Sequence, residues 1–451
     1  MKLEPIPAIF LLILCAAPAG ALAQSPPMTL RQAIDRALGE NPQATIAKVN
    51  EKDATAAAAL ARTQLIPQLR FTEDISRGND PVYVFGERLR EREFTQSDFA
   101  LNALNRPQPL GNFSSRFSGS WMAFDSWKTE KEFRGTDLAK KSAADSSKAV
   151  SQQIVLRVVG AYQSVLYAER EVGVAEHEEQ TAETLLTQVS GRVKAGLAVD
   201  SDRMAAQVNM AARKEELIAA RGDRDVAWAE LSAAMGVPDL PVTQLNPIEP
   251  HTFPSSSLDD ELALAAKARP DLMALGDAQR AQGEAVEAAR SEFGPRVSAY
   301  GNWEEDRGSL TSPGGNNWVA GVQISVDILP LGKRDQLARA SATKQRIDAE
   351  LRQQQEQVRL DVSRAHIHRE TAELSLETAR AAMDQAAESL RILRNRYNAG
   401  LATITDLLRA EDAERGSQSN YWHAVYGNAM AYAQLLYAEG MLTPDAAEGL
   451  Q

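Results

Sequence analysis

Apolar residues recur every three or four positions along most of this chain, which is the spacing of one face of an α-helix. Two long segments carry this pattern without any proline, 110–237 and 331–443, as at Val155 and Val158. Because proline breaks the interior of a helix, segments that lack it permit very long helices. At ~1.5 Å per residue, a helix from about 130 to 193 would be ~96 Å long. The pattern predicts rod-like helical hairpins with a coiled-coil-like seam.

Four shorter segments instead alternate apolar and polar residues with a period of two, which predicts β-strands. They lie at about 67–78, 113–124, 295–305 and 317–329. Their length and period suit the strands of a transmembrane β-barrel, although alternation alone suits a soluble sandwich equally. Four strands cannot close a membrane barrel, for which roughly eight is the minimum, so a membrane role requires several chains to share one barrel.

The two halves of the chain repeat each other. One set of matched residues is separated by 228 positions and a later set by 204 positions: Leu30/Leu258, Ala37/Ala265, Pro42/Pro270 and Pro67/Pro295, then Arg192/Arg396, Gly196/Gly400, Leu197/Leu401 and Gly236/Gly440. One enlarged loop nearly accounts for this shift of 24, because segment 79–112 has 34 residues and its counterpart 306–316 has 11. Each half is predicted to contain a helix (about 29–65 and 258–293), a strand pair, a long helix, a Gly-Leu turn and a returning helix.

This order divides the chain into consecutive segments. We predict a signal peptide over 1–23, a first structural repeat over 24–240, a proline-rich connector over 241–257, a second structural repeat over 258–440 and a C-terminal tail over 441–451. The signal is indicated by Lys2, an apolar run from Ala8 to Ala17 and the small-residue site that ends at Ala23. That run is too short to span a bilayer, and no later stretch approaches the ~20 apolar residues that a helical span needs.

Composition and motifs narrow the possible functions. The formal net charge is −12, which disfavours a nucleic-acid partner. Cys15 is the only cysteine and lies in the predicted signal, so the exported protein would carry no disulfide. His366 and His368 point to different faces of a predicted helix, which favours solvated surface over a metal pair. The segment around Gly332 resembles a phosphate loop, but Asp327 occupies the position of the required first glycine. We expect no enzyme activity and no cofactor.

The duplicated order resembles that of the TolC-like outer-membrane factor (outer membrane efflux protein) family. The likeness covers about residues 28 to 440, and its most specific motifs are the turns Arg192-Val-Lys-Ala-Gly196-Leu197 and Arg396-Tyr-Asn-Ala-Gly400-Leu401, with the opening segment Thr29 to Gln43. The resemblance implies a mainly α protein whose homotrimer forms a 12-stranded membrane β-barrel on a long α-helical periplasmic tunnel. It also implies a passive exit duct in the outer membrane, working with a periplasmic adaptor protein and an inner-membrane pump.

The two Gly-Leu turns are candidate adaptor-docking tips. Gly196 and Gly400 are expected to supply the positive backbone angle that ends one helix before the next begins. Leu197 and Leu401 follow them, and by resemblance these tips would face the adaptor across the periplasm. Arg192 and Arg396 have two open interpretations, adaptor contact or a favourable interaction with the dipole of the helix C-terminus.

Asp406 and Arg409 are candidate residues of a pore constriction. By resemblance, Asp406 occupies a place where family members narrow the tunnel with acidic side chains, and three copies would form a ring that favours cations. Alternatively, Thr403 and Asp406 form a capping box at the start of a helix. Arg409 stands one turn later, where it weakens an acidic ring and could pair with Asp406.

Aromatic residues in the predicted strands are candidates for a membrane belt, because amphipathic rings prefer membrane interfaces. They are Trp121, Tyr300, Trp303 and Trp318. Packing between helices is the competing interpretation for each of them. The loop 79–112 contains Tyr83, Phe85, Phe94 and Phe99 among mixed charges, which predicts a packed cap that faces the outside.

The primary hypothesis is an outer-membrane channel component of a tripartite efflux or type I secretion system. The alternative is a periplasmic adaptor or coiled-coil scaffold, which would also contain a long helical hairpin. Adaptors usually carry one hairpin with β-domains outside it, whereas this chain has two hairpins with barrel-like strands inside each half.

Overall fold

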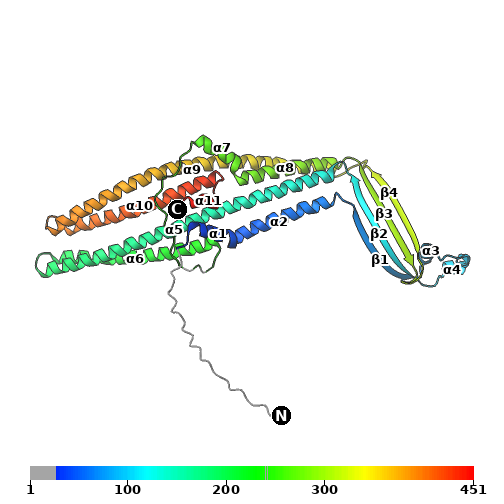
Figure 1. Cartoon of the computed structure of the whole chain (residues 1–451), viewed down its shortest axis with the longest axis horizontal. Coiled ribbons are helices and arrows are strands. Elements are labelled where there is room, and N and C mark those ends of the chain that lie inside the picture. The colour runs from blue at the N-terminus through cyan, green and yellow to red at the C-terminus, as the bar shows by residue number, and fades with distance from the viewer. Residues whose placement is uncertain (1–26, 239, 241, 451) are drawn as a thin grey trace, which may run out of the picture.

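The computed structural model describes residues 27–238, 240 and 242–450, and shows a long helical rod with a β-sheet at one end (Figure 1). The predicted signal peptide lies outside the described residues. The first half contains α1 (Leu30–Glu40), α2 (Pro42–Thr63), β1 (Gln68–Gly78), α3 (Pro81–Arg90), the 3-10 helix η1 (Gln96–Phe99), α4 (Leu101–Asn105), β2 (Leu110–Phe124), α5 (Lys128–Lys194) and α6 (Asp200–Met235). The second half contains α7 (Leu258–Ala268), α8 (Pro270–Ser291), β3 (Arg296–Arg307), β4 (Gly315–Ser325), α9 (Lys333–Asn398), α10 (Ile404–Ala438) and α11 (Pro444–Glu448).

The predicted duplicated order of helix, strand pair, long helix and returning helix is confirmed. The long helices α5 and α9 have 67 and 66 residues, so each is ~100 Å long. Along α5 lie α2 and α6, one after the other, and α8 and α10 lie along α9 in the same way (Figure 1). Of the helices in the described part of the chain, none has an apolar stretch sufficient to cross a membrane.

The opening helix of each half is broken, whereas the sequence pattern predicted one continuous helix. The breaks fall at Asn41 (φ −65°, ψ 127°) and Arg269 (φ −67°, ψ 117°), each directly before the proline that begins the next helix. A proline disfavours the helical conformation of the residue before it, so Pro42 and Pro270 set both breaks. The repeated prolines indicated where the breaks lie. The breaks were not predicted because the helical spacing of apolar residues continues across both prolines.

Each break is covered by the end of a returning helix. The left-handed Gly236 (φ 72°) follows α6, and a Cβ atom there would lie 2.6 Å from Cα of Asn41. The left-handed Gly440 (φ 79°) follows α10, and a Cβ atom there would lie 2.7 Å from Cα of Arg269. The matched glycines of the repeat therefore let two chain segments touch at the same place in both halves.

The largest hydrophobic core lies near these breaks, where α1, α5, α6, α10 and α11 meet. Tyr162 is fully buried there, with its hydroxyl 2.8 Å from the carbonyl oxygens of Met28 and Asn246. Residues of the predicted C-terminal tail join this core, since Leu442 and Leu450 are fully buried around the short helix α11. A second, smaller core lies nearer the Gly-Leu turns and contains Leu185, Val189, Ala206, Leu390, Tyr397, Ile404, Leu407 and Ala410.

The strands form one antiparallel sheet in the order β1-β2-β3-β4, so the central pair β2 and β3 joins the two halves. Within the described residues, β1 and β4 are its edges. The enlarged loop between β1 and β2 folds into α3, η1 and α4, at the end of the sheet that is farthest from the helices (Figure 1).

Candidate functional site

The sheet has one apolar face and one polar face, because successive side chains of a strand point to opposite sides. Apolar side chains of all four strands share the first face, and most of them are exposed in the single chain: Leu69, Phe71, Ile75, Phe117, Trp121, Trp303, Trp318, Val322 and Ile324. A contiguous exposed apolar surface of this kind marks contact with a membrane or another protein. The polar face carries residues such as Ser114, Arg116 and Glu304.

Four aromatic rings form a continuous row across the apolar face. The register pairs Phe71 with Phe117, Phe117 with Trp303, and Trp303 with Trp318. The first two ring pairs have centroid distances of 4.8 and 5.9 Å, and Trp318 is 76% exposed. Trp303 and Trp318 were candidates from the sequence. Phe71 and Phe117 were not, because only the strand register shows that they lie at the same height.

The other two aromatic candidates lie elsewhere. Trp121 is on the apolar face, four residues along β2 from the row, and its indole N–H donates to the carbonyl of Leu65 at 3.2 Å. Tyr300 is on the polar face, so its assignment to the belt is wrong. The cause is the two-residue period, which puts Ala299 and Gly301 on the apolar face instead. Tyr300 covers Gly321, where a Cβ atom would lie 2.7 Å from its hydroxyl.

The alternating pattern of the strands did not single out Trp127, an exposed aromatic residue that directly precedes α5. Its backbone is left-handed (φ 70°), a conformation that is uncommon for a bulky residue, and its side chain is 65% exposed. Its ring packs edge-on against Phe124, with centroids 5.8 Å apart. The same place before α9 is taken by Gly332 (φ 83°), so the second half uses the residue that adopts this conformation without strain. This departure from the internal repeat was visible in the sequence.

The two Gly-Leu turns have nearly identical geometry. Gly196 (φ 72°) and Gly400 (φ 74°) are left-handed, as predicted, and a Cβ atom on either would meet nothing within 4 Å. The N–H of Leu197 donates to the carbonyl of Arg192 at 2.8 Å, and Leu401 makes the equivalent bond to Arg396 at 2.8 Å. These bonds satisfy helix-end carbonyls, as in a Schellman motif. Both leucines are exposed, by 72% and 69%.

The two tip arginines make different contacts. The guanidinium of Arg192 lies over the ring of Tyr397, 5.2 Å from its centroid, and so connects the first hairpin to the second. This cation–π contact gives Arg192 a structural role that neither sequence interpretation included. Arg396 contributes instead to the electrostatic environment of Asp406.

Asp406 forms the predicted capping box with Thr403 at the start of α10. Its carboxylate accepts bonds from the hydroxyl of Thr403 at 2.7 Å and from its backbone N–H at 3.1 Å. These bonds lower the pKa of Asp406, and Arg409 and Arg396 lower it further. Among the described residues, no ion pair joins Asp406 to Arg409. The structure therefore supports capping, while a constriction by Asp406 and Arg409 stays a prediction that concerns several chains.

The two candidate histidines of α9, His366 and His368, differ in environment. His368 is exposed, but His366 is largely covered by α7, and its Nδ1 lies 2.9 Å from a carboxylate oxygen of the buried Glu261. The predicted solvated surface is therefore wrong for His366, because the helical pattern of α9 could not show that α7 folds over it. In the part of the chain that the structure describes, no group of three or more His, Cys, Asp or Glu residues is arranged to hold a metal ion.

This sequence and this fold are similar to those of known proteins. Residues 33–237 and 262–440 match the model of the family described as "Outer membrane efflux protein". The chain is 23% identical over 420 residues to the alkaline protease secretion protein AprF of Pseudomonas aeruginosa, covering 90% of this chain and 83% of that protein. It is 25% identical over 338 residues to the protein CyaE of Bordetella pertussis, covering 73% of this chain and 71% of that protein. Its fold is similar to that of the Campylobacter jejuni CmeC outer membrane channel, with a TM-score of 0.75, 17% identity, and coverage of 91% of this chain and 85% of that one.

Proposed function

This chain belongs to the outer membrane efflux protein family, and on that premise we propose that three copies form one passive exit duct across the outer membrane. The protein is an outer-membrane channel component of the kind used in efflux and type I secretion. In the proposed trimer, each copy contributes four strands to a 12-stranded barrel and its helices to a periplasmic tunnel. A periplasmic adaptor and an inner-membrane pump supply the cargo and the energy.

The observation that carries the proposal is the open sheet with one uncovered apolar face. Two edges, β1 and β4, are left without partner strands in the described chain, and unpaired edges invite pairing with another chain. In lipid, every backbone polar group must be satisfied, so a spanning sheet must close. Pairing β4 of one copy with β1 of the next closes it, with the apolar face toward lipid and the polar face toward the pore.

The height of the apolar face supports this orientation. Trp127 follows Phe117 by ten residues. The seven steps within β2, which ends at Phe124, span about 18 Å along the barrel axis at about 3.3 Å per residue and a strand tilt of about 40°. Trp127 lies beyond the strand and extends the apolar face toward the usual height of about 25 Å. The row of Phe71, Phe117, Trp303 and Trp318 would mark the outer interface, and Trp127 the inner one.

The exposed leucines of both tips support docking of the adaptor. Leu197 and Leu401 lie at the end of the rod opposite the sheet, where they cannot contact the membrane that holds the sheet. Val199, two residues after Leu197, is also exposed, and neighbouring exposed apolar side chains are a feature of protein interaction sites. The proposal therefore assigns the tips Arg192–Leu197 and Arg396–Leu401 to the adaptor.

Two adjacent residues of β4 test the trimeric barrel. Val322 lies on the apolar face and Gln323 on the polar face, and both are exposed in the single chain. We expect Val322→Lys to reduce the heat-resistant trimer recovered from outer membranes, because lysine on the lipid face costs about 2–4 kcal/mol near the bilayer midplane. Gln323→Lys should leave the trimer intact. Equal loss in both variants, or a water-soluble periplasmic monomer of the unaltered protein, would contradict the proposal.

A further inference from the structure

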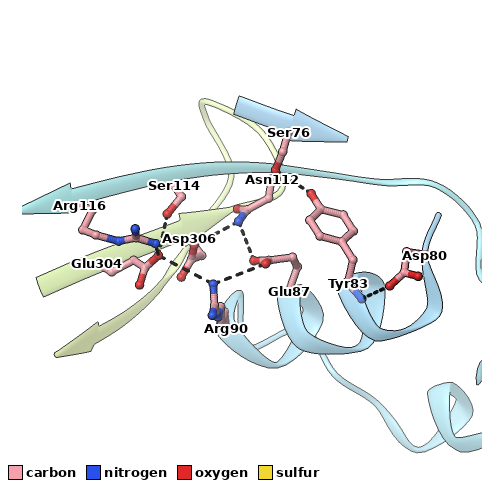
Figure 2. Close-up of polar contacts among 10 residues, drawn as sticks. All are labelled: Ser76, Asp80, Tyr83, Glu87, Arg90, Asn112, Ser114, Arg116, Glu304 and Asp306. Atoms are coloured by element: carbon pink, nitrogen blue, oxygen red, sulfur yellow. Dashed lines mark hydrogen bonds and ion pairs between the residues drawn. The ribbon is translucent and has the colours of Figure 1, made fainter. Parts of the chain in front are cut away.

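The segment 79–109, which joins β1 to β2, folds onto the polar face at the outer end of the sheet. From the end of α3, Arg92 donates to the backbone carbonyl of Asn316 at 2.7 Å. Asn112 at the start of β2 donates to Glu87 of α3 at 2.6 Å (Figure 2). The contact is close, since a Cβ atom on Gly315 would lie 1.8 Å from the carbonyl oxygen of Arg90. The second half joins β3 to β4 by 308–314 alone, so it has no equivalent of this segment.

Acidic side chains concentrate where α3 meets the sheet. Glu87 and Glu91 come from the segment and Glu304 and Asp306 from β3, and all four are buried. Asn112 also donates to Asp306, at 3.1 Å. Three arginines face the cluster. Arg90 lies 3.5 Å from Glu87 and 3.9 Å from Glu304, and Arg116 of β2 also pairs with Glu304. Arg88 of α3 pairs instead with Asp98, at 2.9 Å. The carboxyl groups therefore outnumber the cations that contact them.

Several buried oxygen atoms of this cluster have no hydrogen-bond partner. They are both carboxyl oxygens of Glu91, which is 3% exposed, one carboxyl oxygen of the fully buried Asp306, and the amide oxygen of Asn112. An unpaired charge in such a place is strongly unfavourable, so Glu91 is more stable when it is neutral. The described residues hold no metal-binding arrangement that would neutralise these oxygens. Uptake of a proton by Glu91 is the simplest neutralisation.

We propose that segment 79–109 forms a constriction at the outer mouth of the pore, and that protonation of the buried Glu91 holds the constriction in place. The inference rests on the proposed trimer, because only there does the polar face of the sheet line a pore. Three copies would place three such segments around the axis. Exposed apolar residues on each segment, Val82, Phe99 and Leu101, would then be available to pack against the segments of the neighbouring copies.

The expected pH dependence has a definite sign. Burial raises the pKa of Glu91 to about 7, helped by the nearby Glu93, Glu87 and Asp306 and opposed by Arg88. Burial also raises the pKa of Glu87, which Arg90 opposes. A carboxyl whose pKa is raised by folding stabilises the folded arrangement below its ordinary pKa, and that contribution is lost as the pH rises through the raised value. The constriction should therefore be firm in mild acid and should loosen above about pH 7.

Single-channel recordings on the purified trimer test the proposal, with the pH of the external chamber varied from about 5.5 to 8.5. We expect the conductance of the unaltered channel to rise, by roughly twofold, as the pH passes about 7. Glu91→Gln keeps this position neutral and should hold the conductance near its low value at every pH. Glu93→Gln, at an exposed glutamate two residues away, should retain a rise with pH. A rise that is unchanged in Glu91→Gln would overturn the assignment of the proton.

A graft keeps the test decisive if Glu91→Gln fails to fold. Replacing 79–109 by the residues 308–314 gives the first hairpin the short connection that already serves the second. We expect the grafted trimer to conduct roughly twofold more than the unaltered channel in mild acid, without dependence on pH. Unaltered conductance in the graft would overturn the constriction. Failure to form any trimer or channel by the unaltered protein would instead contradict the proposed function.

Discussion

At the scale of single residues, Asp406 caps a helix and is also the candidate residue of the proposed constriction. Its bonds to Thr403 fix the start of α10 and lower its pKa, which favours the ionised carboxylate. Because the pKa is lowered, the contribution of this cap to stability is present above the ordinary value and is lost as the pH falls through the lowered one. In a trimer, three such carboxylates would face one another only if Asp406 points toward the axis.

Asp406→Ala and Thr403→Ala separate these functions. We expect Asp406→Ala to reduce the cation selectivity of single channels, because it removes three negative charges from the proposed ring. Thr403→Ala removes the capping hydroxyl, at about 1 kcal/mol per helix, but keeps the charge, so its selectivity should be normal. The measurement is the reversal potential in a salt gradient. Unchanged selectivity in Asp406→Ala would leave that residue with the capping role alone.

Single-residue assignments from the sequence were correct where local backbone chemistry decided them. The capping box and the left-handed glycines of the tips needed only residues close in the chain. Tyr300 was assigned to the wrong face, because the face of a strand residue depends on which residues of the neighbouring strands it pairs with. His366 was assigned to the surface, because the covering helix α7 is about one hundred positions away in the sequence.

At the scale of elements, the broken helices and the glycines that cover them form one repeated joint. Pro42 and Pro270 determine where each break occurs, and Gly236 and Gly440 allow a returning helix to end against it. The sequence contained all four residues as matched pairs of the repeat. Their contact could not be predicted, because nothing in the pattern showed that the end of α6 returns to the start of α2.

Gly236→Ala and Gly196→Ala form a matched pair that measures this contact. Both glycines have a φ of 72°, so alanine should cost about 1–2 kcal/mol of backbone strain at either position. Only at Gly236 would the new Cβ atom also meet backbone, 2.6 Å away. We expect Gly236→Ala to lower the melting temperature of the helices by more than Gly196→Ala does. Equal decreases in melting temperature, measured by circular dichroism, would show that the contact at Gly236 accommodates the added Cβ atom without further loss of stability.

At the scale of the whole molecule, most of what the sequence could predict comes from two features. The chain is duplicated, and its sheet and its Gly-Leu turns lie at opposite ends of the helical rod. Long proline-free helical patterns, four alternating segments and repeated turns were sufficient for the fold class. The strand register, the helical content of the outer loop and the contact of Arg192 with Tyr397 depend on residues far apart in sequence. Those features decide the details of the proposed membrane belt and of the tips.

The exposed leucines of the two tips are expected to matter for export by the complete transport system. We expect the double variant Leu197→Glu and Leu401→Glu to form trimers with normal conductance but to lose adaptor-dependent export, because both exposed apolar contacts become charged. Arg192→Lys, which retains the charge over Tyr397, serves as a control for general damage to the tip. Export can be measured as drug resistance or protein secretion in cells that lack the native gene. Full export by the double variant would contradict docking at these leucines.

The two unpartnered sheet edges have a genetic consequence. If neighbouring copies complete one wall, a chain with a damaged edge strand harms every ring that it enters, including rings with two sound members. In a cell that makes equal amounts of sound and damaged chains, only about one ring in eight would be wholly sound if assembly is random. Alleles that injure β1 or β4 should therefore act dominantly, whereas alleles that prevent export of the chain should be recessive.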